Sequence, residues 1–280
     1  MEIKRLNVEV STVCNAKCSL CVRHRNFSTW KSKGFKIPKL YLNLDKFEAL
    51  DWDNTNIHYF ILCGSFGDPI FHPEFFRLID IIHKMGKKFI VSTNGEPHNE
   101  DWWKQLAKQC HYPNQILFGI DGLDAKTHEK YRGTSFDKVI RNAKAFIGVG
   151  GQASLQFIAF KHNEHQISEI ESFRKNLGFR NARIINSRMY TDVLEAPITS
   201  IIEDNRMGGI GPLSCFAAVG ELAMDVHTKL YICCYSYIRT YFGDDTKIKT
   251  YDTFKQLKKS VYFRLAGEMD FCKTCLQRKD

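Results

Sequence analysis

The sequence lacks any apolar run that approaches the roughly 18 residues needed to span a bilayer, which argues against a membrane-spanning segment. Its first five residues lead into alternating strand-like residues and not into the apolar core of a signal peptide. Internal repeats and low-complexity tracts are also missing, which argues against repeat architectures. We therefore expect a cytoplasmic protein that does not contact a membrane.

A strong charge imbalance is also missing, although the formal net charge is +9. The excess of basic residues lies partly in two interrupted stretches: Lys31, Lys33, Lys36 and Lys39, then Lys255, Lys258 and Lys259. No nucleic-acid module accompanies them, so we do not expect a nucleic-acid partner. A solvated basic surface explains this charge, and an acidic or phosphorylated partner is the alternative.

Cysteine, by contrast, is abundant. The chain has ten cysteines in 280 residues, within a composition that is 44% hydrophobic and able to bury a core. The cytosol keeps thiols reduced, so a disulfide framework explains them poorly. Eight of the ten form two clusters: Cys14, Cys18 and Cys21, then Cys215, Cys233, Cys234, Cys272 and Cys275. Clustered cysteines in such a chain indicate metal binding.

Short strand-like runs alternate with helix-like stretches over most of the chain. The predicted strands are Leu6–Val10, Ile57–Cys63, Lys88–Ser92, Gln115–Ile120, Ser154–Phe160 and Ala182–Asn186. The predicted helices are Asp45–Leu50, Pro73–Lys84, Glu100–Gln109, Phe136–Ile147 and Glu164–Leu177. This alternation indicates a parallel sheet with right-handed crossovers. Six units are two short of a full barrel, so we predict an α/β fold, a partial (β/α)6 TIM-like barrel with its site at the carboxyl ends of the strands.

The alternation ends near residue 190, which divides the chain into predicted regions. Residues 1–195 form the barrel, and residues 196–213, which contain Pro, Gly-Gly and Gly-Pro, form a linker. Residues 214–280 form a small α+β domain, with a hairpin of Glu221–Met224 and Lys229–Cys233 and a helix near Thr253–Leu265.

The first cysteine cluster, Cys14-Asn-Ala-Lys-Cys18-Ser-Leu-Cys21, directly follows the first predicted strand. Thiolates are soft ligands that suit iron–sulfur clusters and zinc. Three cysteines at this spacing can hold one cubane and leave its fourth iron open, whereas structural zinc takes four ligands. His24 can supply a fourth ligand, so zinc is the alternative.

A C-x3-C-x2-C motif after the first strand of a six-unit β/α chain resembles the radical S-adenosylmethionine (SAM) superfamily. That family often has an aromatic residue just before the third cysteine, where this chain has Leu20. The resemblance implies that Cys14, Cys18 and Cys21 bind three irons of a [4Fe–4S] cluster. It also implies that SAM chelates the fourth iron through its amino and carboxylate groups.

Later strand ends carry the same resemblance. The loop Gly64-Ser65-Phe66-Gly67-Asp68-Pro69 resembles the family's Gly-Gly-Glu-Pro-like loop for the methionine amino group, with Asp68 in place of Glu. The segment Ser92–Gly95 resembles the family's ribose and methionine contacts, and Arg132 is our candidate for the methionine carboxylate. The implied cofactor-binding residues are Gly64, Ser65, Phe66, Gly67, Asp68, Ser92, Asn94, Asp121 and Arg132. Each is alternatively ordinary turn chemistry or an ion pair, but together they follow successive strands.

The second cysteine cluster, with Cys215, Cys233 and the pair Cys272-Lys-Thr-Cys275, can hold zinc or another iron–sulfur cluster. After a radical SAM barrel it resembles the twitch domain, a shortened SPASM domain that holds an auxiliary [4Fe–4S] cluster. The spacing of 18 positions from Cys215 favours Cys233, although the adjacent Cys234 is open as the ligand. The layout is similar to that of the radical SAM dehydrogenase of the butirosin pathway.

The resemblance implies reductive cleavage of SAM to a 5′-deoxyadenosyl radical, which abstracts hydrogen from a substrate. An external one-electron donor such as flavodoxin or ferredoxin is the implied reductant. The layout favours oxidation of a small alcohol or sugar-like molecule, with the auxiliary cluster as electron acceptor and Arg188 as candidate catalytic residue. The alternative is modification of a ribosomally made peptide. A non-catalytic iron–sulfur carrier or zinc-binding module is the alternative from another class.

Overall fold

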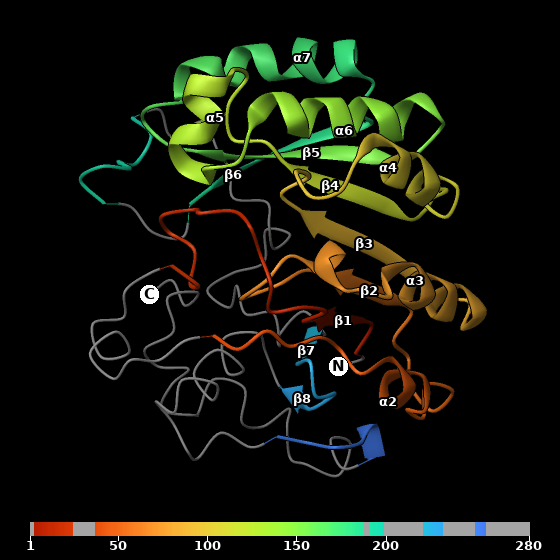
Figure 1. Ribbon diagram of the computed structural model, residues 1–280. Helices are drawn as coiled ribbons and strands as arrows, with labels where there is room; N and C mark the ends of the chain where they lie inside the picture. Colours follow the sequence, from red (N-terminus) through yellow and green to blue (C-terminus); the bar gives the residue numbers. More distant parts are fainter. Residues whose placement is uncertain (1–2, 25–36, 188–190, 199–220, 232–249, 256–280) are drawn as a thin grey trace. The chain divides into compact units, whose positions relative to one another are not determined.

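The computed structural model describes residues 3–24, 37–187, 191–198, 221–231 and 250–255 (Figure 1). These residues form two compact units. The first unit contains residues 3–12, 37–88, 221–231 and 250–255, and the second contains residues 13–24, 89–187 and 191–198. The predicted linker and most of the predicted C-terminal domain lie outside the described residues, so both stay predictions.

In the first unit, β1 (Arg5–Val8) pairs in parallel with β2 (Tyr59–Leu62) and with β7 (Glu221–Met224). The chain then turns back as the antiparallel β8 (Leu230–Tyr231). Side chains of β1 alternate between buried and partly exposed, because successive residues of a strand point to opposite faces. The carboxylate of Glu221 lies against β1, 3.5 Å from the Asn7 side-chain amide and 3.9 Å from Arg5 Nε.

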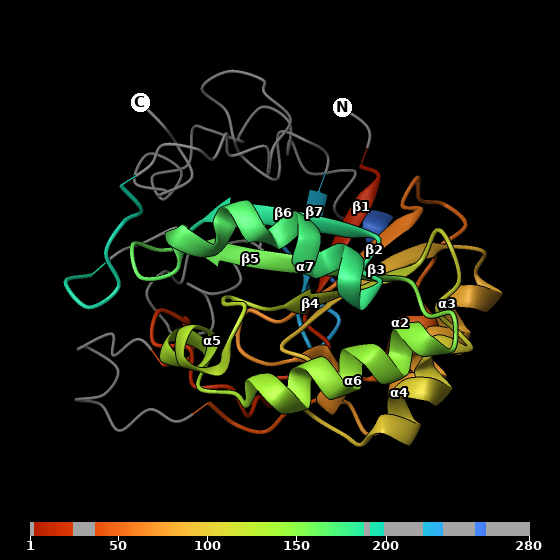
Figure 2. The same ribbon diagram turned by 90° about the horizontal axis from the view of Figure 1, so that it is seen from above.

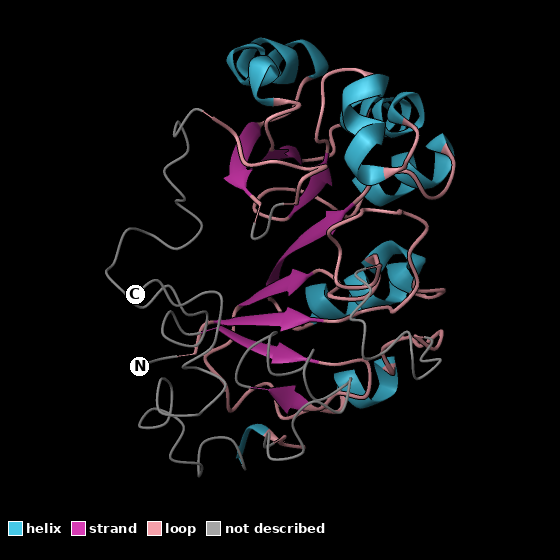
Figure 3. Cartoon of the chain, turned by 90° about the vertical axis from the view of Figure 1, so that its left-hand side faces the viewer, coloured by secondary structure: helices cyan, strands magenta, loops and turns pink. Residues whose placement is uncertain are grey.

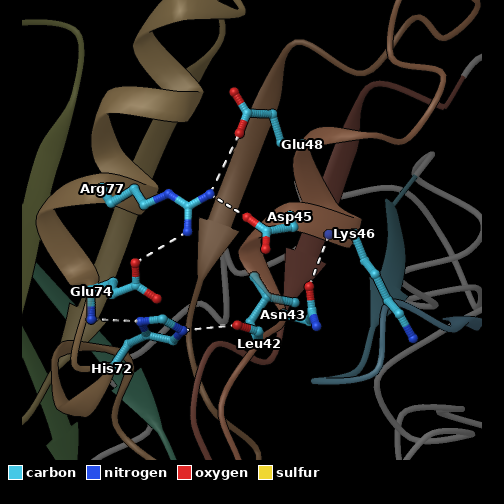
Figure 4. Close-up of polar contacts among 8 residues, drawn as sticks. All are labelled: Leu42, Asn43, Asp45, Lys46, Glu48, His72, Glu74 and Arg77. Atoms are coloured by element: carbon cyan, nitrogen blue, oxygen red, sulfur yellow. Dashed lines mark hydrogen bonds and ion pairs between the residues drawn. The ribbon is translucent and has the colours of Figure 1, made fainter.

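Two helices of the first unit, α2 (Leu44–Glu48) and α3 (Phe75–Lys84), are joined by polar contacts (Figure 4). The guanidinium of Arg77 in α3 contacts Asp45 of α2 and lies 3.1 Å from Glu74. The buried ring of His72 accepts the Glu74 N–H at Nδ1 and donates from Nε2 to the Leu42 carbonyl, over 3.1 and 2.9 Å. Exposed ion pairs contribute little by themselves, so the buried bonds of His72 fix this region more strongly.

The second unit contains four parallel strands, which pair in the order β3 (Lys88–Thr93), β4 (Gln115–Gly119), β5 (Ala153–Ala159) and β6 (Asn181–Asn186). The connections include α4 (Glu100–Ala107), α5 (Ala125–Arg132), α6 (Phe136–Gly148), a 3₁₀ helix η2 (Glu164–Glu169) and α7 (Ile170–Leu177). The helices lie on one face of these strands (Figures 1 and 3). Each connection returns the chain to the same end, as parallel pairing requires. Within the described residues, no helix is long and apolar enough to cross a bilayer.

An aromatic cluster forms the core between the helices and strands of the second unit. Trp103 of α4, Phe118 of β4 and Phe146 of α6 are fully buried. The ring centroid of Trp103 lies 5.0 Å from that of Phe118 and 6.1 Å from that of Phe146. The Trp103 indole N–H donates to the Pro97 carbonyl over 2.9 Å, so its polar atom is satisfied. This cluster holds α4 and α6 side by side (Figure 2).

All six predicted barrel strands are present, with ends shifted by at most two residues, and the first hairpin strand has the predicted bounds. Residues 164–169, predicted as the first part of a helix over Glu164–Leu177, form the 3₁₀ helix η2, and α7 begins at Ile170. Two larger features were not predicted at all. Helix α5 has few apolar residues, and its ends are marked by Asp124, which accepts the Thr127 N–H, and by Gly133, whose φ is 61°. The other is the pairing of β7 with β1.

Trp103 and its neighbour Trp102 provide a matched test of this core. We expect Trp103→Ala to lower the free energy of unfolding by about 3–5 kcal/mol, because the substitution opens a cavity among fully buried rings. Trp102 is partly exposed and stacks on His98, so Trp102→Ala should cost much less. Urea denaturation followed by circular dichroism measures both, and equal losses would contradict this description of the core.

Candidate functional site

The three-cysteine loop belongs to the second unit and is built from short turns. The Cys21 N–H donates to the Cys18 carbonyl over 3.0 Å, and the His24 N–H donates to the Cys21 carbonyl over 2.9 Å. The Nε2 atom of His24 lies 2.8 Å from the Ala16 carbonyl oxygen and is occupied by that hydrogen bond. The loop therefore folds back on itself within eleven residues, from Cys14 to His24.

The loop packs into a hydrophobic cluster. Its members are Ala16, Cys18, Tyr131, Phe160 and Leu194, with Cys14 and Cys21 packed against them. Burial raises the pKa of the Cys18 thiol to about 11, although the nearby Arg132 guanidinium opposes the rise. A thiolate in such a place needs a positive partner, and a bound metal supplies one.

The donor set fits a [4Fe–4S] cluster. Cys14, Cys18 and Cys21 lie on one loop, and the structure places none of them in a disulfide. A [4Fe–4S] cube takes its cysteines on separate irons, so three thiols of one loop leave its fourth iron open.

Asn94, which follows β3, contacts the cysteine loop. Its Oδ1 accepts the Glu96 N–H over 2.9 Å, which orients the amide so that Nδ2 faces the loop. Nδ2 lies 3.0 Å from Asn15 Oδ1 and 3.7 Å from Cys14 Sγ. The Glu96 carboxylate in turn accepts the Asn15 side-chain N–H and, over 2.7 Å, the Ser135 N–H. The predicted contact of Asn94 with SAM stays a prediction, whereas its contact with Cys14 is a new observation.

Asp121 and Arg132 form a buried ion pair through Arg132 Nε. The Asp121 side chain is fully buried and also accepts the Ile158 N–H over 2.6 Å. Burial raises the pKa of Asp121, and the guanidinium and the Ile158 N–H oppose that rise. Burial alone would lower the pKa of Arg132, but the charges of Asp121, Cys18 and Tyr131 and the hydrogen bond to Asp121 together outweigh it and raise that pKa. The guanidinium is therefore a fixed positive charge.

Arg132 also reaches the cysteine loop through its backbone. Its carbonyl oxygen accepts the Lys17 N–H over 3.0 Å and lies 3.9 Å from the Cys18 thiol. Gly119 in β4 leaves room for the side chain, since a Cβ there would lie 2.4 Å from Arg132 Nη2. One residue thus connects α5, β4 and the cysteine loop.

Two further buried residues hold Asp121 in place. His128 accepts the Asp121 N–H at Nδ1 over 3.2 Å, and its Nε2 lies 3.0 Å from Thr134 Oγ1. Burial lowers the pKa of His128 to about 3, so its ring is neutral at neutral pH. The Asn163 side-chain amide donates to the carbonyls of Asp121 and Ile158, over 3.0 and 2.9 Å.

The Gly64–Asp68 loop belongs to the first unit, where it binds Glu9. The Glu9 carboxylate is 3% exposed and accepts the backbone N–H groups of Ser65, Phe66 and Gly67, over 2.6, 3.2 and 3.2 Å. Burial raises the pKa of Glu9 to about 8, and these N–H groups oppose the rise. An otherwise costly buried carboxylate is therefore paired with a row of amide dipoles.

The other predicted cofactor residues lie in defined positions. Asp68 is buried, and its side chain accepts the Ile70 N–H over 3.3 Å at the start of the 3₁₀ helix η1 (Pro69–Phe71). Phe66 is buried, and Ser92 is half-buried on β3, opposite the buried face of Val91 and Thr93. The contacts of these residues with SAM stay predictions.

Sequence reasoning missed Glu9, which binds the Gly64–Asp68 loop, and His128 and Asn163, which hold Asp121. Glu9 had a usable signal, because a carboxylate between Val8 and Val10 interrupts an apolar strand. His128 and Asn163 had no such signal, since the residues around them in the sequence do not show which groups they bond to. The predicted catalytic Arg188 and the cysteines of the second cluster, Cys215, Cys233, Cys234, Cys272 and Cys275, lie outside the described residues.

Comparison with known proteins identifies a family match. The profile described as "Radical SAM superfamily" matches residues 8–173, more than half of the chain. A tungsten-containing aldehyde ferredoxin oxidoreductase cofactor-modifying protein of Pyrococcus furiosus is 22% identical, over 92% of this chain and 80% of that protein.

Two further relatives are named as maturing enzymes. The mycofactocin maturase MftC of Mycobacterium tuberculosis is 26% identical over 67% of this chain and 46% of its own length. The cysteine-type anaerobic sulfatase-maturating enzyme of Clostridium novyi is 27% identical over 62% of this chain and 48% of its own length. This chain thus spans less than half the length of either.

Solved structures of Streptococcus suis SuiB share the fold. SuiB bound to S-adenosylmethionine matches with a TM-score of 0.67 and 15% identity, over 96% of this chain and 66% of that chain. SuiB bound to its precursor peptide SuiA matches with a TM-score of 0.65 and 14% identity. At this identity the likeness is one of fold, and it confirms the predicted α/β class with a mostly parallel sheet and a partial barrel.

Gly119 tests the packing of the buried ion pair. We expect Gly119→Ala to lower the free energy of unfolding by about 1–3 kcal/mol, because the added methyl displaces a guanidinium that Asp121 holds. Gly148→Ala is the matched control, since a Cβ there has no heavy atom within 4 Å, and it should leave stability unchanged or slightly higher. Urea denaturation of both variants measures the free energy of unfolding. A Gly119→Ala variant as stable as the unchanged chain would contradict the described packing.

Proposed function

The chain belongs to the radical SAM superfamily, and from this premise we propose that it uses SAM to modify a peptide or protein substrate. Family membership makes the chain an enzyme and implies a SAM-binding [4Fe–4S] cluster. We assign Cys14, Cys18 and Cys21 as the ligands of that cluster. The observation that carries this assignment is the packing of three cysteines of one loop in or against one hydrophobic cluster.

The chain's own residues prepare this place for the chemistry. When bound and reduced, the cluster supplies the electron that cleaves the sulfonium of SAM into methionine and a 5′-deoxyadenosyl radical. Tyr131 and Phe160 exclude water from the Cys18 side, which protects a radical from competing hydrogen donors. Asn94 directs an N–H toward Cys14, and the fixed charge of Arg132 offsets negative charge near Cys18.

The relatives favour a peptide substrate over oxidation of a small alcohol or sugar-like molecule. MftC is named as a maturase, the Clostridium relative as a sulfatase-maturating enzyme, and SuiB has been solved with a precursor peptide. A small cofactor is the second candidate substrate, because the match to the Pyrococcus cofactor-modifying protein covers 92% of this chain. The similarity in layout to the butirosin-pathway dehydrogenase stays a prediction.

The second cysteine cluster completes the proposal. We assign Cys215, Cys233, Cys272 and Cys275 to an auxiliary [4Fe–4S] cluster, on the spacing of the sequence alone. An external one-electron donor such as flavodoxin or ferredoxin is the proposed reductant. Arg188 stays a candidate catalytic residue, also on the sequence alone.

Removal of the first three cysteines tests the cluster assignment. We expect a variant with Cys14, Cys18 and Cys21 all changed to Ala to release no 5′-deoxyadenosine from SAM after anaerobic reconstitution and reduction. Its iron and sulfide content should fall by one cluster relative to the unchanged chain. Cys63→Ala is the control, because Cys63 follows β2 in the first unit and its thiol bonds to Asn7 Oδ1.

The same assay decides between the classes of function. Release of 5′-deoxyadenosine by the triple variant would contradict the ligand assignment. A reconstituted unchanged chain that releases none would favour an electron carrier or a zinc module over an enzyme.

Deuterium transfer tests the substrate class. Incubation of the reduced enzyme with SAM and deuterated candidate peptides should place deuterium in 5′-deoxyadenosine, which mass spectrometry detects. Transfer from a small cofactor with none from any peptide would overturn the peptide proposal in favour of the second candidate.

The contact of Asn94 with Cys14 predicts a change in reduction potential. We expect Asn94→Leu to shift the potential of the SAM-binding cluster to more negative values, because an N–H directed at a ligating sulfur stabilises the reduced state. Asn142→Leu is the control, since Asn142 donates to the carbonyls of Gly95 and Glu96 in the same loop without approaching the sulfur. Redox titration followed by electron paramagnetic resonance, without SAM, measures both, and equal shifts would count against a direct effect.

A further inference from the structure

Glu9 is the least expected polar group of the first unit. It lies just beyond β1, between the fully buried Val8 and Val10, and is itself 3% exposed. A buried carboxylate normally pairs with a cation or a metal. Its described partners are instead three consecutive backbone N–H groups of the Gly64–Asp68 loop and the Ser65 side chain. Such a row of amides forms an anion-binding concavity, and here a side chain of the same protein fills it.

This arrangement also sets the direction of the loop carbonyls. In a planar trans peptide, the N–H and the C=O of the same peptide unit point in opposite directions. The N–H groups of Ser65, Phe66 and Gly67 point toward Glu9. The carbonyls of the same three peptide units, which belong to Gly64, Ser65 and Phe66, therefore point away from it. Three acceptors on one side of a loop form a receptor for a donor with several N–H groups.

The backbone has little freedom to take another shape here. A Cβ on Gly64 would lie 1.8 Å from the Gly67 carbonyl oxygen, and a Cβ on Gly67 would lie 2.0 Å from the Ser11 carbonyl oxygen. The loop therefore folds tightly on itself and against the chain that follows β1. Within this turn, Glu9 is the side chain that binds the row of N–H groups.

Polarity favours a hydrogen-bond donor on the outer side of the loop. The carbonyl ends of the peptide dipoles face outward, and buried Glu9 accepts the opposite, N–H ends. A primary amine presents N–H donors to outward carbonyls whether it is protonated or bound to a metal through its nitrogen. An anion would meet the wrong end of every dipole.

We propose that Glu9 is a positioning residue that shapes the Gly64–Asp68 loop into a receptor for the N–H groups of a primary amine, which is the amino group of SAM. The inference rests on the function proposed above, because it takes SAM as the ligand. It adds a role for a residue outside the loop itself. Glu9 acts through the loop and touches no reacting atom.

Two ligands separate positioning from general structural support. S-adenosylhomocysteine carries the amino group, and its analogue with hydrogen in place of that group lacks it. We expect Glu9→Gln to weaken binding of S-adenosylhomocysteine by about tenfold, the effect of losing hydrogen bonds that hold the loop, because the amide replaces one of the two accepting oxygens with an NH₂ donor. Binding of the desamino analogue should change little. Equilibrium dialysis with the reconstituted enzyme measures both affinities.

Two variants serve as controls. Glu221→Gln removes another buried carboxylate of the same unit, one that contacts Asn7 of β1, and should leave both affinities unchanged. Glu9→Asp keeps the carboxyl group but shortens the side chain, and should show a smaller loss with the same selectivity for the amino-bearing ligand. If Glu9→Gln fails to fold, judged by its melting temperature and cluster signal, Glu9→Asp decides the question.

The outcomes distinguish this inference from the proposed function. An unchanged chain that binds neither ligand and releases no 5′-deoxyadenosine overturns the function. An unchanged chain that releases 5′-deoxyadenosine but binds both ligands equally overturns the inference alone. Equal losses for both ligands in the Glu9 variants, or no loss for either, also overturn the inference while the function stands.

Discussion

The ion pair between Arg132 and Asp121 is the contact on which the cysteine loop depends. The side chain of Arg132 is held by Asp121. The backbone carbonyl of Arg132 accepts the Lys17 N–H and faces the Cys18 thiol. His128 and Asn163 hold Asp121 from the other side. Removing one partner of a buried pair leaves an uncompensated charge, so this set is stable only when it is complete. The loop that presents the thiols is therefore shaped by α5 and the strand ends as much as by its own sequence.

A second buried carboxylate follows the same physical rule in the first unit. Glu9 and Asp121 are each buried just beyond the carboxyl end of a strand. Hydrogen bonds from backbone N–H groups offset the cost of burying each carboxyl group. Asp121 also has a guanidinium, whereas the described partners of Glu9 are amide N–H groups and the Ser65 side chain, all of them uncharged. Burial raises the pKa of both groups, which shows how costly these positions are. Such groups are found where a protein must fix the shape of a loop, and functional loops are the usual case.

The barrel strands were predictable because local patterns decide them. Short runs of Ile, Val and Phe bounded by turn residues gave every strand from β1 to β6. Helix α5 was missed because its buried residues include Thr127 and His128, which carry no apolar periodicity. Two other contacts join residues distant in sequence: β7 pairs with β1, and Glu9 hydrogen-bonds to the Gly64–Asp68 loop. A single sequence does not reveal such contacts. The three-cysteine motif was recognisable, but the contact of Asn94 with Cys14 was not.

The account's central claim is that a cluster held by Cys14, Cys18 and Cys21 binds SAM. Electron–nuclear double resonance of the reduced enzyme with SAM labelled with ¹⁵N at its amino group tests this most directly. The account predicts a nitrogen hyperfine coupling to the cluster that is absent without SAM and lost in the triple cysteine variant. An intact, reduced cluster that shows no such coupling at saturating SAM would contradict the claim.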